Sequence, residues 1–247
     1  MVVRGPDIGD CSRVQSITDV LDGFSEACLV RGDALDLYQA VPDGVLDAVV
    51  TDPPYCNTGD SASVMKTSGK GFSLPKETQF FEAWIREHLT LWSRLLRPDG
   101  VVWLTVDWRG AMALDAAASR LGFREPKVGV WDRGGLGMGY ALRSTYECFA
   151  VVPMSAWEPL RRDVPDVWRH PWSPAHRKHG HSAEKPVPLI RQALSVFTRP
   201  GALVLDPFAG SGTTGKACAE EGRRFIGFER EDVFVERALS RLDLHTR

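Results

Sequence analysis

The stretch "LDAVVTDPPYCNTG" (residues 46–59) and the stretch "LVLDPFAGSGTTG" (residues 203–215) each carry an apolar run that ends in Asp-Pro. Continuous apolar runs of this kind are typical of strands that are buried on both faces of a parallel sheet. The prolines and glycines that follow cannot continue a regular strand. Two strands that both end on a carboxylate predict one site built from both.

Strands and helices alternate along the rest of the chain. We expect strands at residues 27–33, 46–52, 100–107, 127–133, 146–153, 202–206 and 223–229. We expect helices at residues 34–41, 79–98, 111–123, 185–199 and 213–222. The strands at 127–133 and 146–153 follow each other without a helix, which predicts an antiparallel pair. The fold class is therefore α/β, with a doubly wound, mostly parallel sheet that contains one antiparallel strand.

The length predicts a single domain over residues 1–247. Residues 1–25 lack a clear period and are interpreted as an N-terminal arm. Residues 157–184 are rich in Pro, Trp, Arg and His, again without a period, and are interpreted as an irregular insertion.

Composition excludes several classes of protein. The five cysteines are scattered and form no CxxC pair, which argues against a disulfide framework or a zinc ribbon and favours the cytoplasm. No apolar run approaches a membrane span, and no signal peptide is recognisable, so we expect no membrane partner. A net charge of −2 leaves nucleic-acid binding open if the basic residues gather on one face.

The stretch "GSGTTG" (residues 210–215) matches GxGxxG between a strand and a helix, a geometry that binds nucleoside cofactors. Glu229 ends the next strand, where an acid holds ribose hydroxyls in such folds. A P-loop is disfavoured because Ala217 occupies the position that needs Ser or Thr. A dinucleotide is disfavoured because the turn is wide and Asp206 would repel pyrophosphate, whereas a carboxylate suits a cationic ammonium.

Together, "DPPY" at residues 52–55 and "DPFAGSGTT" at residues 206–214 resemble the amino-group DNA methyltransferases, the N6-adenine/N4-cytosine family. The order of the two motifs is similar to that of the circularly permuted β class. The resemblance extends from about Ala27 to the C-terminus. It implies a Rossmann-like, S-adenosylmethionine-dependent methyltransferase fold that is circularly permuted, with residues 157–184 as a short target-recognition insertion.

The resemblance also implies roles for individual residues. The predicted cofactor-binding residues are Asp33, Lys185, Asp206, Phe208, Ala209, Gly210, Gly212, Thr213 and Glu229. The predicted catalytic residues are Asp52, Pro53, Pro54 and Tyr55. Asp206 would face the cofactor ammonium, and Asp33 would accept from its adenine amino group, although Asp33 could instead cap the following helix. The chain departs from the family at Ala183, where a threonine hydroxyl is often found.

The chemistry of the "DPPY" corner follows from its acceptors. Asp52 and the carbonyl of Pro53 can each accept a hydrogen bond from an exocyclic amine, which aims its lone pair at a methyl group. The target base must leave the duplex, and Tyr55 can stack on it.

We therefore predict a DNA adenine-N6 methyltransferase. The alternatives are a cytosine-N4 enzyme, which often carries Ser in place of Asp52, an RNA or protein methyltransferase, and a nucleotide-binding regulator without catalysis. Cys56 is interpreted as a packing residue. His176, His179 and His181 are interpreted as solvated or phosphate-facing residues, so no metal site is predicted.

Double-stranded DNA is the predicted partner. The predicted contacts lie in residues 56–76 and 157–184 and in one further glycine-rich segment. They are Lys66, Lys70, Lys76, Arg143, Arg161, Arg162, Arg169, Arg177 and Lys178. Because the insertion is short, we also expect a short target site or a homodimer that shares its reading.

Overall fold

The structure is a computed structural model that describes residues 16–54, 78–121, 123–137, 141–172 and 184–243. Its strands are β1 (Ala27–Arg31), β2 (Leu46–Thr51), β3 (Leu96–Val106), β4 (Lys127–Asp132), β5 (Tyr146–Pro153), β6 (Val167–Arg169), β7 (Leu203–Asp206) and β8 (Arg224–Glu229). Its helices are α1 (Ile17–Leu21), α2 (Ala34–Leu37), the 3-10 turn η1 (Tyr38–Ala40), α3 (Thr78–Leu95), α4 (Trp108–Arg120), α5 (Val187–Phe197), α6 (Thr213–Glu221) and α7 (Asp232–Arg241).

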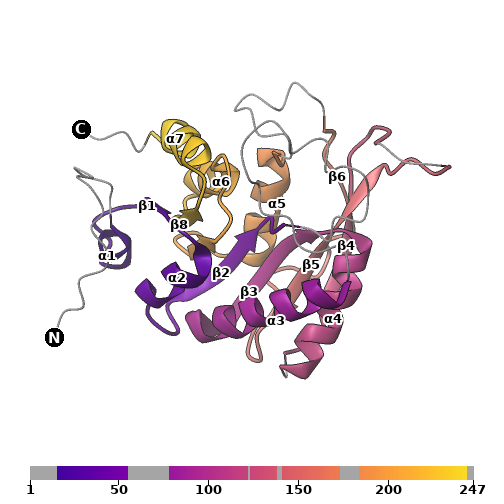
Figure 1. The fold of residues 1–247 in the computed structure, drawn as a ribbon, viewed down its shortest axis with the longest axis horizontal. Coiled ribbons are helices and arrows are strands. Elements are labelled where there is room, and N and C mark those ends of the chain that lie inside the picture. Colours follow the sequence, from indigo (N-terminus) through magenta and orange to yellow (C-terminus); the bar gives the residue numbers. More distant parts are fainter. Residues whose placement is uncertain (1–15, 55–77, 122, 138–140, 173–183, 244–247) are drawn as a thin grey trace.

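The strands of the described residues join one sheet in the order β1-β8-β7-β2-β3-β5-β4-β6 (Figure 1). Among them β5 alone runs antiparallel to its neighbours β3 and β4. The predicted fold class is therefore confirmed. β7 and β8, from the end of the chain, lie between β1 and β2, from its beginning, so the two strands that end in Asp-Pro are neighbours.

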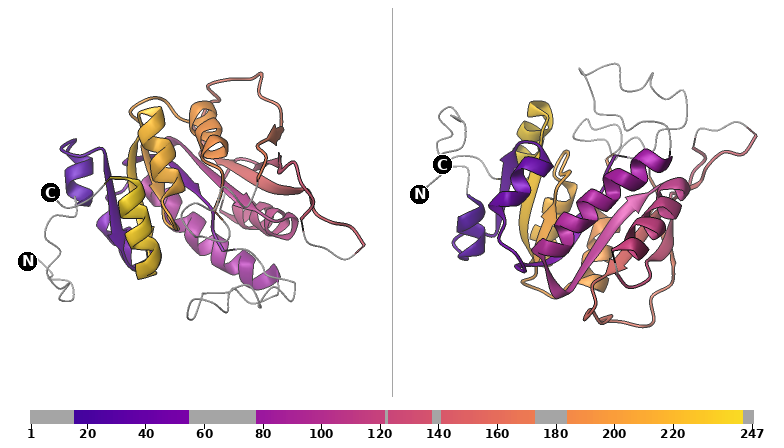
Figure 2. Two further views of the ribbon diagram at one scale, coloured as in Figure 1. Left: turned by 90° about the horizontal axis from the view of Figure 1, so that it is seen from above. Right: turned by 60° about the horizontal axis from the view of Figure 1, so that its bottom comes forward.

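Helices cover both faces of the sheet (Figures 1 and 2). On one face α2, α3 and α4 pack through buried side chains such as Trp92 and Leu114. On the other face α5, α6 and α7 pack through side chains such as Leu194 and Ala238. This two-sided burial is the physical reason why β7 is apolar on both of its faces until it reaches Asp206.

The longest helix follows its predicted spacing. Phe81, Ile85, His88 and Trp92 of α3 are all buried. The helix ends at Leu95, slightly before the predicted stop at Pro98.

Three local expectations were wrong or incomplete. The segment up to residue 25 is not wholly irregular, because Ser16 and Asp19 form a capping box that starts α1. The insertion at 157–184 contains β6, which pairs with β4 at the edge of the sheet. The C-terminal helix α7 was not recognised in the sequence; it packs against the sheet through the buried Ala238.

Candidate active site

The carboxyl ends of β2 and β7 meet, as the two Asp-Pro motifs predict. Val49 pairs with Leu205 in the parallel ladder, so Thr51 and Asp206 end neighbouring strands. The Thr51 hydroxyl donates a hydrogen bond to Asp206 Oδ1 over 2.7 Å. The "DPPY" corner and the glycine loop therefore start from two strand ends that are bonded to each other.

The carboxylate of Asp52 is held through both of its oxygens. The Thr105 hydroxyl of β3 donates a hydrogen bond to Oδ1, and the Lys185 ammonium lies 2.8 Å from Oδ2. The Asp52 side chain is 28% exposed, so it is fixed in orientation but still accessible. Pro53 is buried and Pro54 half-buried, whereas Tyr55 lies outside the described residues.

Lys185 lies between two carboxylates. Its Nζ is 2.8 Å from Asp52 and 3.4 Å from Glu147, and its side chain is only 7% exposed. Burial opposes the charge of the ammonium, but the two carboxylates outweigh this effect and raise the pKa of Lys185. The two carboxylates thus favour the charged form of the predicted cofactor residue, which contacts the predicted catalytic residue directly.

Sequence reasoning missed three residues of this network: Thr105, Glu147 and Arg133. Arg133 Nη1 lies 3.2 Å from Glu147 Oε1. Because β5 is antiparallel, its amino end, which carries Glu147, lies at the same edge of the sheet as the carboxyl ends of its neighbours. The available signal was an acid at the start of the otherwise apolar "YECFAVVP".

Asp206 is buried beneath the glycine loop rather than exposed beside it. Besides the Thr51 hydroxyl, it accepts the backbone N–H of Phe208 over 3.0 Å. Burial raises the pKa of Asp206 to about 6, against the lowering effect of hydrogen bonds from Thr214, Thr51 and Phe208. Its position shows that it anchors the loop, and its contact with an ammonium stays a prediction.

The loop residues Phe208 and Ala209 turn toward α3 and β8. The ring of Phe208 lies 5.5 Å from Trp84 and 5.4 Å from His88, between ring centroids. The N–H of Ala209 donates to Phe228 over 2.9 Å. The turn is therefore fixed from both sides.

Two glycines of the loop adopt backbone angles that favour glycine and allow close packing. Gly210 has φ 52° and donates its N–H to Glu229 Oε2 over 2.8 Å. Gly212 has φ 80°, and a Cβ there would lie 3.0 Å from the Cβ of Ala238 in α7. Glu229 also accepts the N–H groups of Arg230 and Glu231, so its carboxylate is held at the end of β8.

A buried ion pair supports the same loop from its far side. Glu184 Oε1 lies 2.8 Å from Arg241 Nη1, and both side chains are almost fully buried. The same Arg241 nitrogen donates to Thr213 Oγ1 over 3.0 Å and to the Ser211 hydroxyl over 3.3 Å. Thr213, a predicted cofactor residue, is thus engaged with α7.

Asp33 caps α2, because its side chain accepts the N–H of Leu35 over 3.0 Å. It also lies 3.7 Å from Arg230. Gly32 donates its N–H to the carbonyl of Glu229 over 3.0 Å. Asp33 and Glu229 therefore lie side by side at the carboxyl ends of the neighbouring strands β1 and β8. The helix-capping alternative is therefore realised, and the exposed carboxylate is still accessible to a ligand.

The described basic residues of the predicted DNA surface are exposed and already partnered. Arg161 pairs with Asp163, Arg162 with Glu158, and Arg169 with Asp132. Arg143 donates to the carbonyl of Gly137 within its own hairpin over 2.8 Å. The other predicted contacts lie outside the described residues: Lys66, Lys70, Lys76, Arg177 and Lys178.

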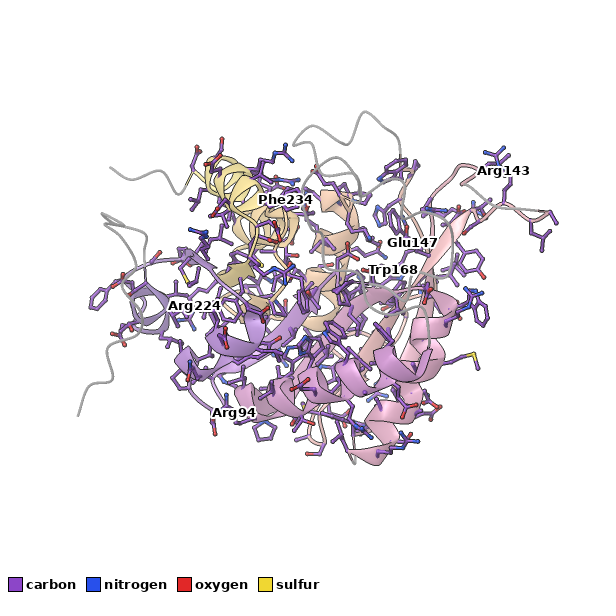
Figure 3. The ribbon with its side chains drawn as sticks, viewed as in Figure 1. Arg94, Arg143, Glu147, Trp168, Arg224 and Phe234 are labelled. Carbon is purple, nitrogen blue, oxygen red and sulfur yellow. The ribbon has the colours of Figure 1, made fainter. Side chains whose placement is uncertain are left out.

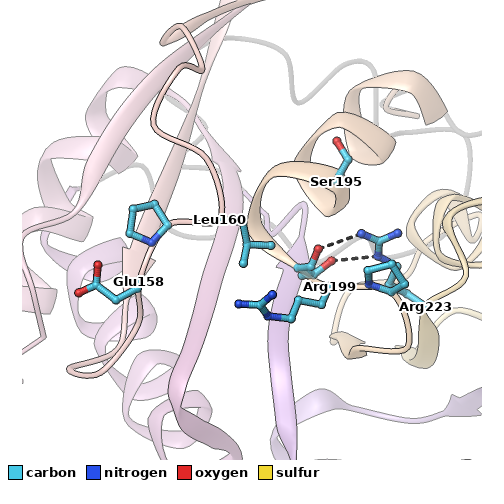
Figure 4. Close-up of a pocket in the computed structure, with 8 residues that line it drawn as sticks. Glu158, Leu160, Ser195, Arg199 and Arg223 are labelled. Atoms are coloured by element: carbon cyan, nitrogen blue, oxygen red, sulfur yellow. Dashed lines mark hydrogen bonds between the residues drawn. The ribbon is translucent and has the colours of Figure 1, made fainter.

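A pocket of about 490 Å³ lies elsewhere, at the carboxyl end of α5 (Figure 4). It is lined by Glu158, Ser195, Arg199 and Arg223, and the Arg223 guanidinium bonds to Thr198. Helix α5 starts beside Lys185 and runs along the strands. The pocket at its carboxyl end therefore lies at the opposite end of the strands from Asp52. The described residues contain no cluster of His, Cys, Asp and Glu that could hold a metal, and no described helix is long and apolar enough to cross a membrane.

The fold is the Rossmann-like fold of the S-adenosylmethionine-dependent methyltransferases. A solved methyltransferase named PvuII, cytosine-N4-specific, superposes with a TM-score of 0.71 at 19% identity over 88% of this chain and 86% of that one. A complex of M1.HpyAVI with S-adenosylmethionine superposes with a TM-score of 0.63 at 21% identity over 88% of this chain and 99% of that one.

Sequence comparison narrows the class to a family. The model of the DNA methylase family N6_N4_Mtase matches residues 46–240, and the chain belongs to this family. YubD, a candidate methylase of Escherichia coli (strain K12), is 26% identical over 86% of this chain and 88% of its own length. The matched region begins at β2 and includes both Asp-Pro motifs.

Proposed function

We propose that this chain transfers a methyl group from S-adenosylmethionine to the exocyclic N6 of adenine in DNA. The observation that carries the proposal is the corner at Asp52. Its carboxylate is fixed by Thr105 and Lys185 while still accessible, and it lies beside the strand that leads into the glycine loop. Membership of the DNA methylase family supports the same reaction.

The residues around the loop fit a nucleoside that carries a cationic ammonium. Asp33 and Glu229 offer carboxylates at one edge of the sheet, and ionised carboxylates keep further lone pairs for a ligand. Glu184 Oε2 is buried and has no hydrogen-bond partner within the described part of the chain, so a cationic donor would satisfy it. When bound, S-adenosylmethionine supplies an electrophilic methyl group.

The chain's own contribution is to orient the amine. Asp52 accepts one hydrogen bond and the carbonyl of Pro53 accepts a second, which leaves the nitrogen lone pair directed at the methyl group. The Lys185 ammonium, 2.8 Å from Oδ2, helps to hold this carboxylate in place. Asp52 therefore acts as an acceptor that positions the amine, and the proton becomes acidic once the nitrogen is methylated.

Cytosine N4 is the second candidate, because the PvuII structure shows that a cytosine-N4-specific enzyme has this fold. Adenine is favoured because Asp52 stands where cytosine-N4 enzymes often carry Ser.

The test is to incubate the protein with labelled S-adenosylmethionine and DNA of mixed sequence, digest the DNA to nucleosides, and identify the labelled one. We expect N6-methyladenine. Label in N4-methylcytosine would establish the second candidate. Unlabelled DNA, with label instead in RNA or protein offered in parallel reactions, would overturn both. Centrifugation of the DNA complex would show whether one copy or two bind each site.

A further inference from the structure

The Lys185 ammonium has two carboxylates within reach. It contacts Asp52 Oδ2 at 2.8 Å and Glu147 Oε2 at 3.4 Å. The other oxygen of Asp52 accepts the Thr105 hydroxyl. Both oxygens of the carboxylate that must receive the target amine therefore already have partners.

The Asp52 carboxylate keeps further lone pairs, so an amine can bind it by sharing an oxygen with Thr105 or Lys185, and sharing weakens the hydrogen bond of each donor. A lysine ammonium has three donors on a flexible stem, so it can exchange acceptors with little movement. It cannot simply leave, because a buried charge without a partner is strongly unfavourable. Glu147 offers a second acceptor of the same charge.

Glu147 is itself held in place. Its Oε1 lies 3.2 Å from Arg133 Nη1, and Arg133 Nη2 donates to the carbonyl of Ser144 over 3.0 Å. These residues lie where the connection between β4 and β5 leaves the sheet. Figure 3 labels Glu147 there and Arg143 farther along the same connection. One oxygen of Glu147 is thus fixed, and the other faces Lys185.

We propose that Glu147 is a positioning residue that takes the Lys185 ammonium from Asp52 when the target amine binds. The inference rests on the proposed function, because it needs an amine as the competitor. No covalent bond changes and no proton moves, and only the hydrogen-bond partner of the Lys185 ammonium differs.

The test uses Glu147→Gln, which keeps the size of the side chain but removes its charge, and compares two DNA duplexes. One carries adenine at the modified position found with the labelled cofactor, and the other carries purine, which lacks the amine. Both place this base opposite an abasic site, so that flipping breaks no base pair in either duplex. If the modified base is cytosine, a pyrimidinone without the 4-amine replaces purine. The parent protein should bind the amine-bearing duplex more tightly, by about 10-fold or more for one hydrogen bond to a charged acceptor.

In Glu147→Gln this preference should disappear, and the single-turnover methylation rate should fall by about 10-fold or more. Calorimetric affinity for S-adenosylmethionine should be unchanged. Glu147→Asp keeps the charge with a shorter reach, so it should retain part of the preference, and it serves in place of Glu147→Gln if that variant melts early.

If Glu147 merely supports the fold, affinity for both duplexes would fall together, the preference would persist, and Glu147→Asp would be no better than Glu147→Gln. That result would overturn the inference. A parent protein that shows no preference for the amine would instead count against the proposed function, so the two failures are distinguishable.

Discussion

The hydroxyl of Thr51 donates a hydrogen bond to Asp206 across 2.7 Å, and so joins the strand of the "DPPY" corner to the strand of the glycine loop. Both side chains are almost fully buried. Asp206 also accepts a hydrogen bond from the N–H of Phe208, and so holds the start of the loop in place. The position of the loop relative to Asp52 is therefore set at the ends of two adjacent strands, before either loop begins.

Thr51→Val should loosen this junction. The substitution keeps the shape but removes a donor to a buried carboxylate, which should cost about 1–3 kcal/mol of unfolding free energy. Urea denaturation at pH 7.5 measures it, with Thr51→Ser as the control that keeps the hydroxyl. Equal stability of the Val and Ser variants would mean that the bond contributes nothing to the junction.

Asp52→Ala and Gly210→Asp should separate catalysis from cofactor binding. Asp52→Ala should lower methyl transfer by at least about 100-fold through loss of orientation, while calorimetric affinity for S-adenosylmethionine falls far less. Gly210→Asp should lose binding first, because Gly210 has φ 52° and donates to Glu229, and a new carboxylate there would repel that acid.

The matched control for Asp52→Ala is Asp99→Ala, since Asp99 is an exposed acid at the other end of β3 from Thr105. It should retain the parental rate. If the Asp52→Ala protein kept near-parental activity, "TDPPY" would be a turn without a catalytic role.

Affinity for S-adenosylmethionine should depend on pH through Asp206. Burial raises its pKa to about 6. Between about pH 4 and pH 6 the folded protein thus keeps a proton that the unfolded chain has lost, and the free protein becomes less stable as the pH rises through this window. If the cofactor ammonium faces Asp206, it favours the ionised form, and affinity should rise by about 10-fold from pH 5 to pH 7.5.

Calorimetry at the two pH values checks this, and Asp206→Asn should flatten the dependence, because the amide oxygen still accepts from Thr51 but carries no charge. A pH-dependent affinity that persists unchanged in Asp206→Asn would assign the effect to another group.

His88→Phe should make the protein more resistant to acid. His88 is buried in an aromatic cluster, with its ring 4.1 Å from Trp84 between centroids, and burial lowers its pKa to about 3. Between pH 6.5, its ordinary pKa, and about pH 3 only the unfolded chain gains the proton. The free energy of unfolding therefore falls as the pH drops through this window. Relative to pH 8, the variant should avoid a loss of about 2 kcal/mol at pH 5, measured by urea denaturation at both values.

Reversing the charge of Arg161, Arg162 and Arg169 should weaken DNA binding and make it less sensitive to salt. The slope of affinity against salt should fall by about 0.9 for each phosphate that the protein no longer neutralises. The matched control reverses Arg94, Arg97 and Arg120, which are also exposed and paired with acids. Binding titrations from low to high salt measure both sets. If the two triple variants behave alike, the insertion is not the DNA surface.

Much of the framework follows from the sequence. The alternation of strands and helices predicts the doubly wound sheet, and the two Asp-Pro motifs predict that β2 and β7 meet, which their pairing confirms. These features are readable because they depend on local chemistry. Proline lacks an N–H, glycine permits the positive φ of Gly210 and Gly212, and an apolar run has to be buried.

Only the tertiary structure shows which side chains control Asp52. Lys185, 133 residues away in the chain, lies on its carboxylate, and Glu147 reaches the same edge because β5 runs antiparallel. The burial of Asp206 beneath the loop and the ion pair of Glu184 with Arg241 are likewise invisible to motif analysis. The physical reason is that the orientation and charge state of a side chain depend on its neighbours in space, and packing brings those neighbours from anywhere in the chain.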